Sequence, residues 1–491
     1  MKQQDDSVKD SVITDTTILS SDSDTRINEY DASDNSDSIN FSLKKSETSS
    51  GKELLYILKN TGPVLITFLF QYLIQIMIPI YFEGKLGTIS LSACSLAITS
   101  FYLSGPAFFN GFATSLDTLC SAAFGAGNYT KVGLYYQRCS LILLFASVPM
   151  MTFWYFPRPI LRMMTDDVQL IDLCEKYLSY MPLAAPAIAI FECSKRFLQS
   201  QNKFSAPTRI NIVALPLSLV LNALLFPKLR FQGPPIVFVI TYWFMCISLI
   251  LYVFFVDGYQ CWNSNISVKN LFSNWAIFYK LGVPGVLMVL SEAFAFQVIT
   301  IMSTRFGTEA LAAQSVVSTL ASFAFQFPFA VGICCTTRIA NIIGSQSSDY
   351  KVAMHIIIRV AGLLSVVNFC WMYLFRYQLA SLFTQDPALI NEICHLLLIV
   401  GFNQFLDCFN VICAAVLRGQ GRQKLGSLLS LFSYYIIGAP LEILLGFYFK
   451  MKVFGLWLGL ALAVSFLTIS EVTVVLNSDW LSIIRRCSKL T

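Results

Sequence analysis

Repeated long apolar runs constrain this chain more than any other feature of its sequence. From Lys52 onward, runs of roughly 18 to 25 mostly apolar residues follow one another, each long enough to cross a hydrocarbon core of about 30 Å. Lipid offers the backbone no hydrogen-bond partners, so such runs must be helices that satisfy their own peptide groups. The composition agrees, because a soluble protein with 55% hydrophobic and 13% charged residues would expose large apolar patches to water. The sequence therefore predicts an all-α integral membrane protein.

Twelve helices are predicted to span the membrane. Their ranges are 62–82, 89–113, 133–155, 177–197, 209–227, 234–256, 283–303, 310–335, 354–375, 393–417, 427–449 and 453–476. Lys and Arg are more numerous on the side that would hold both termini, with examples at Lys195, Arg418 and Arg485. Positive charge marks the cytosolic side of membrane proteins, so both termini are expected in the cytosol.

The second half of the chain repeats the first at a nearly constant offset. The offset is 221 residues for Pro63 with Pro284 and for Gln71 with Glu292, 220 for LSACS (91–95) with LAAQS (311–315), and 219 for Gly125 with Gly344, Asp167 with Asp386 and Leu198 with Leu417. Each half holds six spans, an even number, so the halves are parallel repeats related by an axis along the membrane normal. Two such lobes enclose a central cleft that rocking exposes to alternate sides. This architecture predicts a transporter.

The repeat also sets the expected domain organisation. Residues 1–52 are rich in Ser and Asp and are expected to form a disordered cytosolic tail. The remaining segments are an N-lobe over 53–256, a cytosolic loop over 257–282, a C-lobe over 283–476 and a cytosolic C-terminal tail over 477–491.

Two acidic residues stand out by their depth in the predicted membrane. Glu292 lies about eight residues after Pro284, and Asp407 about fourteen after Ile393, which places both near mid-span. An ionised carboxylate there costs roughly 2.5–3.5 kcal/mol or more, and desolvation favours its protonated form. Such a group can hold either a proton or a cation, and that competition is the basis of antiport. The alternative is a structural carboxylate bonded to neighbouring polar side chains. The other acids are expected near span ends, within reach of water or headgroups: Asp117, Glu192, Glu442 and Glu471.

Other polar and aromatic residues are candidates for the same cavity. Gln71 and Gln75 occupy the equivalent depth in the first half, where they can donate hydrogen bonds but cannot carry a proton. Proton coupling would therefore belong to the second half. Tyr434 and Tyr435 are candidates for stacking on planar ligands or facing cations, with ordinary helix packing as the alternative.

At these residues the chain resembles the eukaryotic branch of the multidrug and toxic compound extrusion (MATE) family. Four stretches carry the resemblance: GFATSLDTLCSAAFGAGN (Gly111 to Asn128), PGVLMVLSEAFAFQ (Pro284 to Gln297), TRIANIIG (Thr337 to Gly344) and VLRGQGRQKLGSLLSLFSYYIIGAP (Val416 to Pro440). The resemblance implies a secondary antiporter that exports organic, often cationic, compounds against inward movement of protons or sodium.

The resemblance also implies roles for single residues. Glu292 and Asp407 match acidic positions in the cavity of the family's second lobe, whereas Gln297 stands where eukaryotic relatives often carry a further Glu. One ionisable group is thereby missing. Within the motifs, Asp117 is interpreted as capping or fixing a loop, and Arg338 and Asn341 as anchors of an interface. The motif glycines, Gly344 among them, are interpreted as permitting tight turns and close helix packing.

The leading functional prediction is a proton-coupled exporter of small organic compounds, with Na⁺ as the alternative coupling ion. A lipid-linked saccharide flippase of the same superfamily, with a basic cavity, and a non-transporting membrane receptor or scaffold are the other hypotheses. An enzyme is not expected, because the two His and fourteen scattered Cys form no metal or nucleophile pattern. No cofactor and no nucleic-acid partner are expected. The expected partners are small organic substrates and the bilayer, with a monomer in the plasma membrane or in a vacuolar or other internal membrane.

Overall fold

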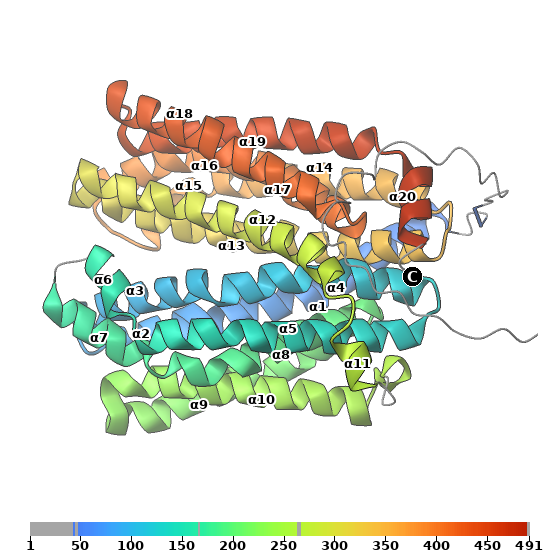
Figure 1. Ribbon diagram of the computed structural model, residues 1–491. Coiled ribbons are helices and arrows are strands. Elements are labelled where there is room, and N and C mark those ends of the chain that lie inside the picture. The colour runs from blue at the N-terminus through green and yellow to red at the C-terminus, as the bar shows by residue number, and fades with distance from the viewer. Residues whose placement is uncertain (1–42, 45–47, 165–166, 263–266, 489–491) are drawn as a thin grey trace, which may run out of the picture. The chain divides into compact units, whose positions relative to one another are not determined.

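The computed structural model describes residues 43–44, 48–164, 167–262 and 267–488, which are almost entirely helical. Within these residues the only β-type pairing is an isolated bridge between Lys44 and Ser347. The prediction of an all-α fold is confirmed. The helices run side by side along most of their length (Figure 1).

The first half of the chain contains six long helical segments and one short helix. In chain order the segments are α1 (Ser50–Tyr72), which continues through a π-helical turn (Leu73–Met77) into α2 (Ile78–Gly84); α3 (Thr88–Ser104) with α4 (Pro106–Gly125); α5 (Tyr129–Tyr155); α7 (Val168–Leu178) with α8 (Ala185–Ser200); α9 (Ser205–Leu229); and α10 (Gly233–Phe255). The short helix α6 (Arg158–Met164) precedes α7.

The second half repeats this order after the short helix α11 (Val268–Leu271). Its segments are α12 (Ala276–Ser303); α13 (Thr308–Gly344); α14 (Tyr350–Leu374); α16 (Pro387–Gly419), preceded by the short α15 (Arg376–Ser381); α17 (Gln423–Leu431), which continues through two π-helical turns (Phe432–Gly438 and Leu444–Tyr448) that flank α18 (Ala439–Ile443); and α19 (Lys452–Leu476). A final helix, α20 (Trp480–Ser488), follows.

Ten helical stretches of the described chain are long and apolar enough to cross a membrane. One of them, Ser205–Phe255, contains both α9 and α10, so the ten stretches hold eleven crossings. The segment α7–α8 is the twelfth. It is less apolar than the other eleven, because α8 carries Glu192, Lys195 and Arg196 within one short stretch. The predicted twelve spans are therefore all helical segments of the structure.

The internal repeat is visible in matching helix caps. Asp167 and Asp386, which are 219 residues apart, each begin a segment as its N-cap. The Asp167 carboxylate accepts hydrogen bonds from the backbone N–H groups of Gln169 and Leu170, and that of Asp386 accepts one from Ala388. An N-cap carboxylate satisfies amides that have no partner within the helix. The same residue thus begins the fourth span of each half.

Three boundaries differ from the predicted ones. Helix α1 begins at Ser50, inside the predicted tail, and Lys44 exchanges backbone hydrogen bonds with Gln346 and Ser348; residues 1–42 lie outside the described residues. The predicted loop over 257–282 is shorter, because α12 begins at Ala276. The predicted C-terminal tail contains α20, whose Ile484 is fully buried. The predicted boundaries came from long apolar runs, and such runs do not reveal the shorter helical segments at the start of α1, at the start of α12 and at α20.

Helix α4 of the first half packs on α12 and α13 of the second. It meets α13 at the end of the bundle where α1 begins and α4 and α13 end, hereafter the terminal end. There Gly125 lies against Asn341, and Gly344 lies against Ala122. A Cβ added at Gly125 would stand 2.1 Å from the Asn341 carbonyl oxygen, and one added at Gly344 would stand 1.9 Å from that of Ala122. Because these positions are related by the offset of 219 residues, the contact is symmetric between α4 and α13. Glycine permits this approach of two helix backbones.

Polar contacts reinforce the junction at the terminal end. The Arg338 guanidinium on α13 makes a bidentate ion pair with the Glu53 carboxylate on α1, with its shortest contacts at 2.8 Å. On the other side of the junction, the Thr118 hydroxyl on α4 donates a 2.6 Å hydrogen bond to the Arg418 carbonyl on α16. Two large apolar clusters lie mostly one within each half, and a smaller cluster of Val64, Phe204, Ala330, Ile333 and Cys334 joins the halves. Each half is therefore packed internally, and polar, apolar and backbone contacts hold the two together.

Candidate functional site

Four ionisable side chains of the second half act on one another in its interior. Glu292 comes from α12, Asp407 and Arg418 from α16, and Glu471 from α19. Asp407 is 1% exposed and Glu471 is fully buried. Glu292 interacts electrostatically with the other three. The two acids that the sequence placed at mid-span are thus brought together, and a third acid and one cation accompany them.

A polar cavity lies between α12, α13, α16 and α17 with the π-helical turn that follows it. Glu292, Asn410, Arg418, Ser430 and Tyr434 supply its polar lining. The remaining walls are apolar and come from Met288, Val289, Phe325, Phe329, Val411 and Ala414. Its volume is about 40 Å³, which accommodates a few water molecules but is far below the roughly 300 Å³ of small-molecule pockets. In this conformation the cavity can hold protons and water, and it must widen to hold an organic molecule.

Few hydrogen bonds satisfy the acids around this cavity. Asp407 Oδ1 accepts a 3.3 Å hydrogen bond from the amide of Asn410, one turn further along α16. Within the described residues, Asp407 Oδ2, Glu292 Oε1 and both carboxylate oxygens of Glu471 are buried without a hydrogen-bond partner. A buried carboxylate without partners strongly disfavours its charged form. These groups are therefore suited to exchange a proton for a positively charged ligand.

A π-helical turn places one tyrosine against the cavity. Tyr434 lies in the turn Phe432–Gly438, is 3% exposed and lines the cavity. Single π-helical turns widen a helix locally and recur at functional sites. Tyr435 is 37% exposed and donates a hydrogen bond to the Ser291 carbonyl instead. Gln297 is half-buried on α12 and is not among the residues that line the cavity.

The corresponding region of the first half is arranged differently. Gln75 donates a hydrogen bond to the Tyr242 hydroxyl, and Gln71 Oε1 accepts one of 3.4 Å from the Lys195 ammonium. Lys195 is buried, makes a 2.7 Å ion pair with Glu192 and stands 5.0 Å from the centre of the Phe68 ring. Here the buried acid Glu192 has a cation in direct contact, which the acids of the second-half cavity lack within the described residues.

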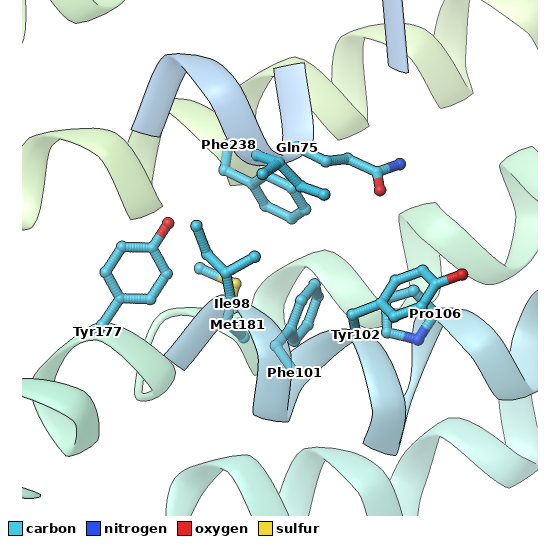
Figure 2. Close-up of a pocket in the computed structure, with 9 residues that line it drawn as sticks. Gln75, Ile98, Phe101, Tyr102, Pro106, Tyr177, Met181 and Phe238 are labelled. Carbon is cyan, nitrogen blue, oxygen red and sulfur yellow. The ribbon is translucent and has the colours of Figure 1, made fainter. Parts of the chain in front are cut away.

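A second, smaller cavity lies in the first half. Figure 2 shows its lining side chains, with Gln75, Tyr102 and Tyr177 placed around Phe101 and Phe238. Its volume is about 10 Å³, at the lower limit for a single water molecule. The lining is mostly aromatic and aliphatic, and no ionisable carboxyl group belongs to it. The acid-lined cavity of the second half is the better candidate for the functional site.

Both halves match one family. The family model MatE matches residues 63–224 and again residues 284–444, which is more than half of the chain. The chain belongs to the MATE family. The two matched segments start and end 221 and 220 residues apart, so the family unit is the repeat deduced from the sequence.

Relatives of known name support the MATE assignment along most of the chain. An uncharacterized transporter of Saccharomyces cerevisiae is 33% identical, and the match covers 89% of this chain and 63% of that protein. Protein DETOXIFICATION 17 of Arabidopsis thaliana is 31% identical, with 85% of this chain and 89% of that protein covered. The crystal structure of the eukaryotic MATE transporter AtDTX14 superimposes with a TM-score of 0.83 at 25% identity and covers 90% of this chain and 99% of that chain. The protein is therefore a multi-pass membrane transporter of the MATE fold.

The prediction that four acids of this MATE transporter are accessible to water or headgroups was wrong. Asp117, Glu192, Glu442 and Glu471 were expected within reach of water or headgroups, but each is at most 7% exposed. Asp117 makes a 2.5 Å ion pair with Arg196, and Glu192 pairs with Lys195. The reason is that a residue near a helix end is still covered when neighbouring helices extend beyond it.

The residues of the MATE motifs lie near the junction of the halves. Asn341 and Gly344 form the close contact of α13 with α4, and Arg338 forms the ion pair with Glu53 on α1. Asp117 lies on α4 and holds Arg196 of α8, which is a contact within the first half rather than a helix cap. The interface interpretation of Arg338 and Asn341 fits these contacts, and the capping interpretation of Asp117 does not.

Sequence reasoning missed several residues of the site. Arg418, Glu471 and Asn410 surround the two predicted acids, and Asn403 is fully buried one turn before Asp407. One signal was available, because Asn403, Asp407 and Asn410 are spaced by four and three residues, which places polar groups on one face of α16. No comparable signal marks Glu471, which is isolated in an apolar helix.

Proposed function

We propose that the protein is a proton-coupled antiporter that exports small organic compounds, cationic or amphipathic, by alternating access. The observation that carries the proposal is that Glu292 lines a polar cavity and Asp407 lies one helical turn from its Asn410 wall, and that within the described residues each has a buried carboxyl oxygen without a hydrogen-bond partner. Desolvation makes a proton or a ligand cation necessary at such groups. A proton that binds there removes the charge that holds the ligand, and this competition couples the two movements.

The junction of the halves supports alternating access. The contacts at the terminal end close that side, because α4 and α13 touch there at backbone distance. Parting them while the opposite ends approach would turn the acid-lined cavity from one side of the membrane to the other. We place the terminal end in the cytosol, as the distribution of Lys and Arg favours.

Protons are the proposed coupling ion because of the partners of Asp407. A Na⁺ ion requires several oxygen ligands that converge on a carboxylate. In the structure Asp407 accepts a hydrogen bond from the Asn410 amide, whose oxygen would have to turn toward the carboxylate to serve as a ligand of a cation. We further propose that the transporter acts as a monomer in the plasma membrane or in a vacuolar or other internal membrane, with small organic molecules and surrounding lipid as its partners.

The test is uphill transport of an organic cation into proteoliposomes with an imposed pH gradient. Glu292→Gln and Asp407→Asn each remove a proton site without changing shape, and each is expected to abolish uphill transport. Glu309→Gln is the matched control, because this acid is exposed in the first turn of α13. Transport at the wild-type level in both site variants would refute proton coupling at these residues.

A further inference from the structure

Arg418 and Glu292 line one cavity without pairing with each other. The two side chains come from α16 and α12, and neither takes part in any ion pair of the described residues. Arg418 Nε and Glu292 Oε1 are both buried without a hydrogen-bond partner in the same part of the chain. Opposite charges that served only to neutralise one another would be expected in contact. Both side chains therefore remain available to a ligand.

The neighbours of Arg418 leave its guanidinium without a contacting carboxylate. Arg418 is 7% exposed and interacts electrostatically with Asp117, Arg196, Glu471 and Glu292. The carboxylate of Asp117 is already engaged by Arg196 at 2.5 Å. A guanidinium presents a planar array of donors that suits a carboxylate, and removal from water makes such a partner more valuable. The cavity thus contains a prepared position for an anion.

The other walls suit a ligand with a positive group close to a negative one. Tyr434 and Phe325 add aromatic faces, which favour an ammonium group beside Glu292. Asn410 and Ser430 add uncharged hydrogen-bonding groups. Phe329 also contacts Phe68 of α1, with 4.9 Å between ring centres, so the cavity borders the junction of the halves. A ligand has a route to it when that junction opens.

We propose that Arg418 is the anion-binding group of the transport cavity and that the preferred cargo is a small zwitterion, with its ammonium group at Glu292 and its carboxylate at Arg418. This inference rests on the proposed function, because it takes the cavity as the transport site. In the exchange, a proton adds to the Glu292 carboxylate and displaces the ammonium group, and the cargo carboxylate leaves Arg418 with it. No covalent bond of the cargo changes. The cargo has no net charge, so exchange for one proton moves one charge across the membrane.

The test compares two probes that differ in one charge. These are 4-(trimethylammonio)butyrate, a zwitterion, and its methyl ester, a cation, both taken up by proteoliposomes under the same pH gradient. Wild-type protein is expected to transport the zwitterion more efficiently. Arg418→Gln is expected to lower kcat/KM for the zwitterion about 10- to 150-fold, as the loss of a charged hydrogen-bond pair predicts, and so to reverse the preference in favour of the ester, which is still carried. Arg418→Lys should retain part of the preference.

Two controls separate the outcomes. Arg422→Gln removes an arginine four residues later, outside the cavity, whose guanidinium donates to the Ser478 hydroxyl, and it should behave as wild type. Ester transport in the Arg418→Gln vesicles reports that this variant is folded. The inference is overturned if wild type carries the ester as well as the zwitterion, or if the Gln and Lys variants lose both probes equally. Transport of the ester alone leaves the proposed function standing, whereas movement of neither probe overturns both.

Discussion

Adding a methyl group to Gly344 should force the terminal end of the transporter apart. In the structure, a Cβ at this position would stand 1.9 Å from the carbonyl oxygen of Ala122, whereas real Cβ contacts stay above 3.0 Å. The obstructing atom belongs to the backbone of α4, so no side chain can rotate away. Helices α4 and α13 must therefore separate by about 1.1 Å or more in Gly344→Ala.

The cost of that separation falls on one conformation only. Overpacking a close contact costs about 1–3 kcal/mol. The contact exists while the terminal end is closed, and the methyl group is harmless once α4 and α13 part. The closed conformation should thus lose a factor of about 5 to 150 in population relative to the open one. Gly125→Ala, the symmetric change, should act in the same way because its Cβ would stand 2.1 Å from the Asn341 carbonyl oxygen.

Distances between spin labels measure this shift directly. One label on the loop after α4 and one on the loop after α13 should give a longer distance population at the terminal end in Gly344→Ala than in wild type. Gly362→Ala is the matched control, because its added Cβ would meet only the Phe409 ring at 3.6 Å, an ordinary contact. An unchanged distance distribution in folded Gly344→Ala protein would refute the idea that this contact closes the terminal end.

Three further predictions concern charge and burial elsewhere in the chain. Glu53→Gln removes the buried partner of the Arg338 guanidinium, so the same spin-label experiment should show an opened terminal end; an unaltered distribution would count against a closing role for the pair. Arg196→Gln leaves the Asp117 carboxylate buried without its cation and should lower the free energy of unfolding by about 3–5 kcal/mol. The double variant that adds Asp117→Asn should recover part of this loss, and thermal unfolding in detergent measures both effects. Burial raises the pKa of the Cys261 thiol to about 11, so roughly 0.1% is thiolate at pH 8. The rate of maleimide labelling at Cys261, measured by peptide mass spectrometry, should therefore rise about tenfold per pH unit. Fast labelling at pH 7 would contradict this.

The sequence predicted the number and order of the spans because length and hydropathy alone decide whether a segment crosses lipid. It also placed Glu292 and Asp407 well inside their helices, since position along a helix follows from the rise per residue. The segment α7–α8 is the exception among the twelve predicted spans, because the charges of α8 keep it out of the helices that are apolar enough to cross a membrane. What can be counted along the chain could therefore be predicted.

The direction in which a side chain faces could not be predicted in the same way. Many of these helices are apolar on all sides, so no polar face shows which neighbour covers a residue. Tyr434 and Tyr435 are adjacent, yet one lines the cavity and the other does not, and a π-helical turn that the sequence does not announce sets their directions. Glu471 approaches Asp407 because α19 packs along α16. These facts belong to tertiary packing.

The backbone pairing of Lys44 with the segment after α13 has a mechanical consequence. The segment that precedes α1 is hydrogen-bonded to the second half. The Lys44 backbone pairs with Gln346 and Ser348, and the Thr48 amide donates to the Asp349 carboxylate. In the proposed alternating access the two halves separate at this end, and these hydrogen bonds would then either break or move together with α1. A protein that binds to the chain before Lys44, or a charge added there, would thus shift the equilibrium between the closed and the open terminal end, at a distance from the transport cavity.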